Sequence, residues 1–94
     1  MFVFDTFNND FTKVSFEIVT YNTQWRQINI VTNDQLDSSG TESLIMRENV
    51  QIGEQSFDLS TKDIKRYIGI LVYFYPDISR TGTGSIQIDN LSLT

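Results

Sequence analysis

Two groups of aromatic and amide side chains in this sequence have the chemistry of a sugar-binding surface. Trp25, Gln27 and Asn29 alternate along one stretch, and tyrosines with even spacing follow later in the chain. Residues an even number apart in an extended strand share a face. Aromatic rings stack on the C–H faces of pyranose rings, and amides supply oriented donors and acceptors for hydroxyl groups. The predicted carbohydrate-binding residues are Trp25, Gln27, Asn29, Tyr67, Tyr73 and Tyr75.

The same aromatic residues have a second interpretation. Large amphipathic side chains are also enriched where subunits meet, or where a loop packs onto a sheet. A structural or oligomerisation module would bury Trp25 and Tyr73 against a neighbouring chain in this way, with no sugar site. Both interpretations remain open at the level of sequence.

The sequence lacks the residues that most hydrolytic sites require. It contains no His and no Cys, which excludes Ser-His and Cys-His nucleophile pairs, ordinary zinc sites and disulfides. A glycoside hydrolase needs two carboxyl groups that face each other across a cleft. Most acids here stand at predicted turns, and nothing brings Glu17 and Glu48, on predicted strands, together. We therefore expect no enzymatic activity.

Charge and hydropathy exclude two further classes of partner. The net charge of -5 argues against nucleic acid, because phosphate binding needs clustered cations. The one basic cluster, Lys62, Lys65 and Arg66, is interrupted by Asp63 and is interpreted as solvated surface. No apolar run approaches the roughly 20 residues of a membrane span, and the first residues lack the basic start of a signal peptide. We expect neither nucleic acid nor membrane as a partner.

The composition predicts that strands position these side chains. The chain has no Ala and is rich in Thr, Ile, Val, Phe and Tyr, which favours an all-β fold. Ninety-four residues suit a single domain, residues 1–94, and the turn signals between short alternating runs predict an antiparallel β-sandwich. The predicted core consists of Val14, Phe16, Ile18, Ile28, Ile30, Ile68, Ile70, Val72, Phe74, Ile86 and Ile88.

Alternation of polar and apolar residues locates the strands. Residues 12–21 and 25–32 are predicted to pair as a hairpin, and residues 66–75 are apolar on both faces, as expected of a central strand. One helical turn is predicted within residues 60–65, where a hydroxyl cap precedes an acid. Loops are predicted at residues 33–41 and 79–84, the second as a hairpin connection. The remaining predicted strands cover residues 43–50, 56–59 and 84–94.

The final strand contains a change of phase. Ile86 and Ile88 share one face, whereas Leu91 and Leu93 are an odd number of residues away and also require burial. An extra residue that bulges out near Asp89 would return both leucines to the core.

Several segments resemble carbohydrate-binding jelly-roll modules. The residues that carry the resemblance are Lys13-Val-Ser-Phe-Glu-Ile18, Phe57-Asp-Leu59, Arg66-Tyr-Ile68 and the closing Ile88-Asp-Asn-Leu91. Their order is similar to the later strands of such modules in extracellular glycoside hydrolases and in bacteriophage tail and baseplate proteins. The resemblance implies a jelly-roll, galactose-binding-like sandwich that binds cell-surface polysaccharide without catalysis, outside the cell or on a virion.

The resemblance also implies a metal site and an assembly. In these modules an acid of the closing run often helps to bind a structural calcium, a role that falls on Asp89, with Asp5, Asn8, Asn9 and Asp10 as candidate partners. Alternatively, Asp89 and Asn90 only stabilise the bulge. The modules usually carry more sequence before residue 13, so the opening strands are expected to be missing or reduced to residues 2–4. Open sheet edges would then favour a homo-oligomer or a place within a larger protein.

Overall fold

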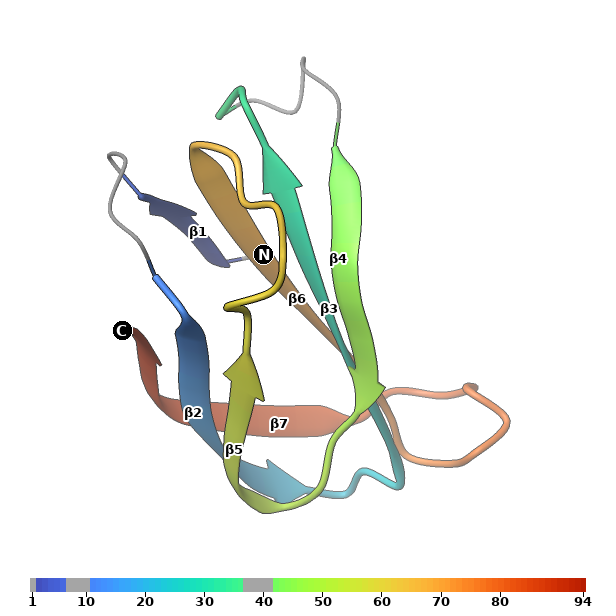
Figure 1. The fold of residues 1–94 in the computed structure, drawn as a ribbon. Coiled ribbons are helices and arrows are strands. Elements are labelled where there is room, and N and C mark those ends of the chain that lie inside the picture. Colours follow the sequence, from blue (N-terminus) through green and yellow to red (C-terminus); the bar gives the residue numbers. More distant parts are fainter. Residues whose placement is uncertain (1, 7–10, 37–41) are drawn as a thin grey trace.

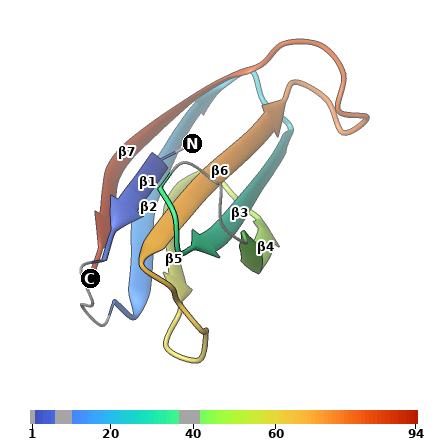
Figure 2. The same cartoon turned by 90° about the horizontal axis from the view of Figure 1, so that it is seen from above.

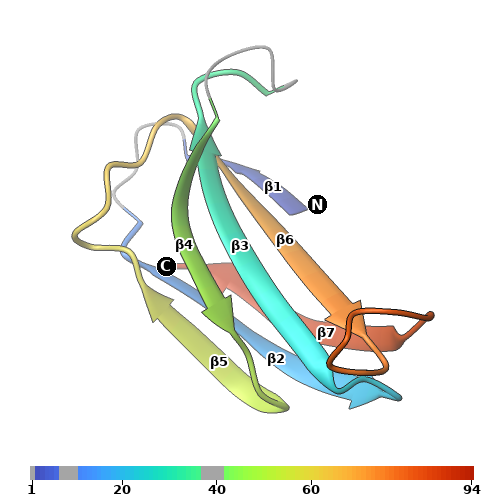
Figure 3. The ribbon, with the colours of Figure 1, turned by 90° about the vertical axis from the view of Figure 1, so that its right-hand side faces the viewer.

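The computed structural model describes residues 2–6, 11–36 and 42–94, and it is an antiparallel β-sandwich (Figure 1). Seven strands form two sheets whose inner faces meet (Figure 3). All strand pairs are antiparallel. The predicted all-β class and sandwich architecture are confirmed. Within the described ranges no helix is long and apolar enough to cross a membrane.

Each sheet has a simple order of strands. Sheet A contains, in order, β1 (Phe2–Asp5), β6 (Tyr67–Tyr75), β3 (Trp25–Asn33) and β4 (Ser43–Asn49). Sheet B contains β5 (Gly53–Asp58), β2 (Lys13–Tyr21) and β7 (Ser85–Leu93). The strand of residues 66–75 is indeed central, since β6 lies between β1 and β3.

The predicted hairpin of β2 and β3 is wrong. These strands belong to different sheets, and the same is true of β6 and β7, so residues 79–84 do not form a hairpin connection either (Figure 2). Among consecutive strands of the described ranges, only β3 and β4 are paired neighbours. The physical reason is that alternation shows which face of a strand is buried but not which strand lies beside it. Both connections arch from one sheet to the other.

The predicted helical turn at residues 60–65 is also wrong. The backbone N–H of Ser60 donates to Asp58 Oδ1 at 2.8 Å, and the N–H of Lys62 donates to the carbonyl of Leu59 at 3.0 Å. The cap is therefore the Asp58 carboxylate, which closes a single turn. Two hydrogen bonds from Ser60 lower the pKa of Asp58, and the bond from its backbone has a larger effect than the bond from its side chain. Beyond this turn the chain continues, without helix, from sheet B to sheet A.

The core lies between the two sheets, as predicted, and extends further. Three partly buried members of the predicted core, Val72, Ile86 and Ile88, pack against it, whereas Phe74 is only half-buried. The prediction missed Val50 and Leu59, which lie just beyond strand ends and are 2% and 1% exposed. The buried cluster comprises Val14, Phe16, Ile18, Ile28, Ile30, Val50, Leu59, Ile68 and Ile70.

The predicted bulge in the last strand is present. Ser15 lies opposite Ser92 while Glu17 lies opposite Asp89, so β7 carries one extra residue there. Asn90 within this interval has a φ of 57°, a left-handed conformation that Asn tolerates better than most residues. The shift allows both Leu91 and Leu93 to pack against the core, as the phase change required.

The strands at the margins leave open edges. Phe2–Asp5 forms a strand of four residues that pairs with β6 alone. In the described part of the chain, β1 and β4 in sheet A and β5 and β7 in sheet B each pair on one side.

Candidate functional site

The outer face of sheet A brings the predicted sugar-binding residues of β3 and β6 together. Because the two strands are antiparallel, the start of β3 lies beside the end of β6. Trp25 is opposite Tyr75, and Gln27 is opposite Tyr73. Residues two apart along each strand point the same way, so these side chains share a face.

These residues line a hollow of about 360 Å³, which we call the β3–β6 hollow. Five of the six predicted sugar-binding residues contribute to it, and sequence reasoning missed its two arginines. Arg47 comes from β4, opposite Asn29, and Arg80 comes from the loop between β6 and β7. The lining residues are Trp25, Gln27, Asn29, Arg47, Tyr73, Tyr75 and Arg80.

The aromatic rings of the hollow differ in how open they are. The rings of Trp25 and Tyr75 are 5.6 Å apart between centroids and tilted by 48°. The guanidinium carbon of Arg80 lies 5.3 Å from the centroid of the Trp25 ring, within cation–π range. Tyr73 is 40% exposed. Tyr73 is thus the more accessible platform, and Trp25 with Tyr75 forms a wall beside it.

The amide of Asn29 fixes one arginine of the hollow. Asn29 is only 8% exposed, and its Oδ1 accepts a hydrogen bond of 3.2 Å from Arg47 Nε. Gln27 lies in register between Tyr73 and Asn49. The floor of the hollow therefore consists of amides, which can both donate to and accept from a hydroxyl group.

The loop that carries Arg80 is organised by Asp77. The carboxylate of Asp77 accepts a bond of 3.1 Å from the backbone N–H of Thr81 and bonds of 2.8 and 2.9 Å from the hydroxyls of Ser79 and Thr81. These bonds lower the pKa of Asp77, and the bond from the Thr81 backbone has the largest effect. Arg80 itself has a φ of 62°, a left-handed backbone conformation that is uncommon for residues other than Gly. The loop lies against the β2–β3 connection (Figure 3), since a Cβ on Gly84 would come within 3.1 Å of Thr23 Cγ2.

Tyr67 does not belong to the β3–β6 hollow. It shares the outer face of sheet A, but it lies opposite Asn33 at the far end of β6. The guanidinium of Arg66 stacks on its ring at 5.1 Å. The hollow that Tyr67 lines has a volume of about 20 Å³, room for about one water molecule and not for a sugar ring.

The predicted calcium ligands divide between the two sheets. Asp89, in sheet B, accepts bonds of 2.9 and 3.1 Å from Gln87 Nε2. Asp5, in sheet A, is paired with Arg66 at 3.0 Å. Asn8, Asn9 and Asp10 lie outside the described residues, and the described ranges contain no group of three or more acids that could hold a metal ion. Calcium binding by Asp89 stays a prediction.

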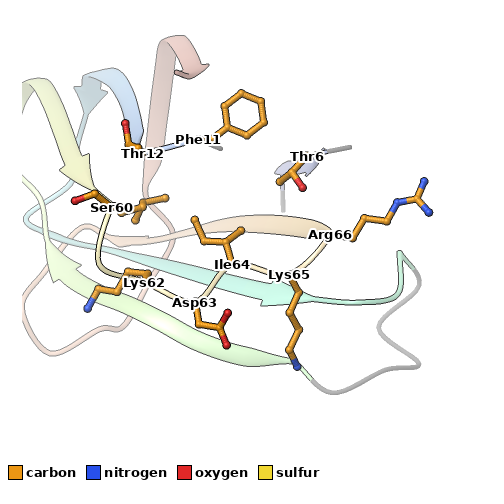
Figure 4. A pocket seen from close by; sticks show the side chains of 10 residues that line it. Thr6, Phe11, Thr12, Ser60, Lys62, Asp63, Ile64, Lys65 and Arg66 are labelled. Carbon is orange, nitrogen blue, oxygen red and sulfur yellow. The ribbon is translucent and has the colours of Figure 1, made fainter. Parts of the chain in front are cut away.

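The basic cluster of the sequence surrounds a second hollow, of about 590 Å³ (Figure 4). Lys62, Lys65 and Arg66 extend away from one another instead of converging on its centre. Asp63 lies among them, and the Arg66 guanidinium is held by Asp5 through bonds of 3.0 and 3.3 Å. A divergent, partly neutralised cluster fits solvated surface better than an anion site.

Comparison of the chain with protein-family models, curated proteins and solved structures found no match. The resemblance to carbohydrate-binding modules stays a prediction.

Proposed function

We propose that this protein is a non-catalytic carbohydrate-binding module that holds a polysaccharide segment in the β3–β6 hollow. The observation that carries the proposal is the convergence of an open tyrosine ring, an indole wall and a floor of amides in one hollow of about 360 Å³. Binding sites for sugars need this combination, because each pyranose has apolar C–H faces and a rim of hydroxyl groups.

Each side chain has a role in this proposal. A pyranose stacks on Tyr73, with Trp25 at its side, and the amides of Gln27 and Asn29 exchange hydrogen bonds with its hydroxyl groups. Both sugar and amides lose water on binding, so we expect a dissociation constant on the order of 0.1 to 1 mM for one site. Several copies in one assembly would raise the avidity.

The setting that suits this function is an extracellular protein or a phage tail, where a module grips cell-surface or wall polysaccharide. The open edges of both sheets support attachment to other domains or to further copies of the chain. We therefore include a homo-oligomer or a larger parent protein in the proposal.

The test is a titration of soluble cell-wall polysaccharides that records the fluorescence of Trp25, the sole tryptophan. Calorimetry on Tyr73→Ala measures the loss of the platform, and Tyr67→Ala is the matched control, because it removes the same side chain from the same strand outside the hollow. We expect saturable binding that Tyr73→Ala weakens at least tenfold, by analogy with aromatic anchors at other interfaces, and that Tyr67→Ala leaves unchanged. Equal effects of both variants, or the absence of binding to every polysaccharide tested, would contradict the proposal.

A structural module is the second candidate, and exposed apolar side chains favour it. Ile52 is 61% exposed and Ile78 is 78% exposed, the latter on the same loop as Arg80. If these residues mark a subunit interface, light scattering will show an oligomer that Ile78→Ser or Ile52→Ser dissociates. A monodisperse monomer at all concentrations would argue against this candidate.

A further inference from the structure

We infer that the β3–β6 hollow selects acidic polysaccharides, whose uronic acid carboxylates pair with Arg47 and Arg80. This inference rests on the proposed function, and it adds the class of sugar. The chain as a whole is acidic, with a net charge of -5, yet both ionisable side chains of fixed charge that line this hollow are cationic. The site is thus a local reversal of the protein's charge.

Neither arginine is neutralised by the described residues. Both side chains are exposed, and neither forms an ion pair within residues 2–6, 11–36 and 42–94. Glu48 follows Arg47 along β4 and therefore points to the opposite side of the strand. Asp77 shares the loop of Arg80, but its carboxylate is occupied by amide and hydroxyl donors of that loop.

Arg47 is held in a conformation that leaves its terminal nitrogens available. Its Nε–H donates to Asn29 Oδ1 at 3.2 Å, and that amide is almost fully buried. The guanidinium fork matches a carboxylate in plane and spacing, so a pre-oriented arginine favours an anionic group over a hydroxyl group. Arg80 is placed similarly by its stacking on Trp25.

The two arginines reach the hollow from different elements. Arg47, on β4, lies beside Asn29, and Arg80, on the β6–β7 loop, lies over Trp25. The exposed ring of Tyr73 lines the same hollow. A sugar stacked on Tyr73 would present its ring substituents toward these side chains. A neutral sugar would stack on Tyr73 and form uncharged hydrogen bonds with the amides, whereas a uronic acid would add a charge-assisted bond to an arginine.

The experiment compares alginate, polygalacturonate and hyaluronan with their carboxyl-reduced counterparts, by calorimetry at 20 mM and 300 mM NaCl. We expect at least one acidic polymer to bind about tenfold more tightly than its reduced form, with the difference diminished at high salt. Arg47→Gln/Arg80→Gln should abolish this difference. Lys13→Gln/Lys62→Gln, which removes two exposed cations outside the hollow, should preserve it. Circular dichroism verifies that all variants are folded.

The outcomes separate the two proposals. Equal binding of acidic and reduced polymers, lost in Tyr73→Ala, would overturn the acidic preference and leave the carbohydrate site intact. An acidic preference that persists in Arg47→Gln/Arg80→Gln would overturn the assignment to these arginines. Absence of binding to every polymer in the panel would overturn both proposals.

Discussion

The guanidinium of Arg80 covers the indole of Trp25, at 5.3 Å from the ring centroid. This contact joins the β6–β7 loop to the first residue of β3, and it makes the only tryptophan of the chain a reporter of the loop. Within the same loop, the Asp77 carboxylate accepts hydrogen bonds from the backbone amide of Thr81 and from the hydroxyls of Ser79 and Thr81.

Replacing Arg80 with Ala should expose Trp25. We expect acrylamide to quench the fluorescence of the variant more strongly and the emission maximum to move to longer wavelength. The free energy of unfolding should fall by less than about 1 kcal/mol, because a cation–π contact at an exposed site contributes little. Arg47→Ala is the control, since it removes the other arginine of the hollow without touching the stacked pair. Identical quenching of the two variants would contradict the arrangement.

Acid should loosen the same loop. The pKa of Asp77 is below its ordinary value of 3.8 because the Thr81 amide and two hydroxyls stabilise the carboxylate. A lowered pKa in the folded state stabilises the fold above the ordinary pKa, and this contribution is lost as the pH falls through the lower folded value. Quenching of Trp25 should therefore increase as the pH falls below about 4.

The variant Asp77→Asn isolates this effect. It should show increased quenching already at pH 7 and a flatter pH profile, since an amide accepts fewer bonds and does not titrate there. Asp58→Asn is the matched control, because Asp58 also has a lowered pKa but caps the turn after β5, outside the hollow. A pH profile of Asp77→Asn that matches the parent protein would refute this role of the carboxylate.

Asn90 tests the bulge in β7. Its φ of 57° suits Gly and Asn, and a residue with a plain Cβ loses roughly 1 to 2 kcal/mol there. Asn90→Ala should therefore lower the free energy of urea unfolding by about 1 kcal/mol, whereas Asn90→Gly should stay within about 0.5 kcal/mol of the parent. Because Asn90 is exposed, packing contributes little to either value. Equal destabilisation by both would argue against backbone conformation as the cause.

Truncation of Ile30 tests the shared core. Ile30 is fully buried between the sheets, so Ile30→Val should cost about 0.5 to 1.5 kcal/mol and Ile30→Ala about 2 to 5 kcal/mol of unfolding free energy. Ile52→Ala, at a side chain 61% exposed, should change it by no more than about 0.5 kcal/mol. Urea denaturation followed by circular dichroism measures all three. A small effect of Ile30→Ala would mean that the two sheets do not pack as described.

The local alternation of polar and apolar residues was sufficient to predict the strands and the bulge. Alternation in β2 and β6 reflects burial on one face and on both faces, and the change of phase between Ile88 and Leu91 has a direct geometric cause in β7. Partners were not predictable in this way. The short turn before Trp25 looks like a hairpin in sequence, but the chain crosses there to the other sheet, because pairing depends on strands far away.

The site was predictable to the same degree. Alternation along each strand correctly predicted that Trp25 and Tyr73 face outward. The antiparallel register of β3 with β6 then brings these two residues together. Even spacing in the sequence also grouped Tyr67 with Tyr73, because both face the same side of β6. Along the strand they are nevertheless separated by roughly 20 Å, at about 3.4 Å per residue. Arg47 and Arg80 reach the hollow from a neighbouring strand and a loop, so no spacing in the sequence indicates them.

The pairing of strands that are far apart in the sequence also affects how the fold forms. Phe2 pairs with Ile70, and Val14 pairs with Leu93, so each of the two early strands has a partner far away in the sequence. Such non-local pairing requires large loops to close first, which slows folding. During synthesis β1 and β2 leave the ribosome before β6 and β7 exist, so the strand edges that pair with these later strands stay open to other chains in the meantime.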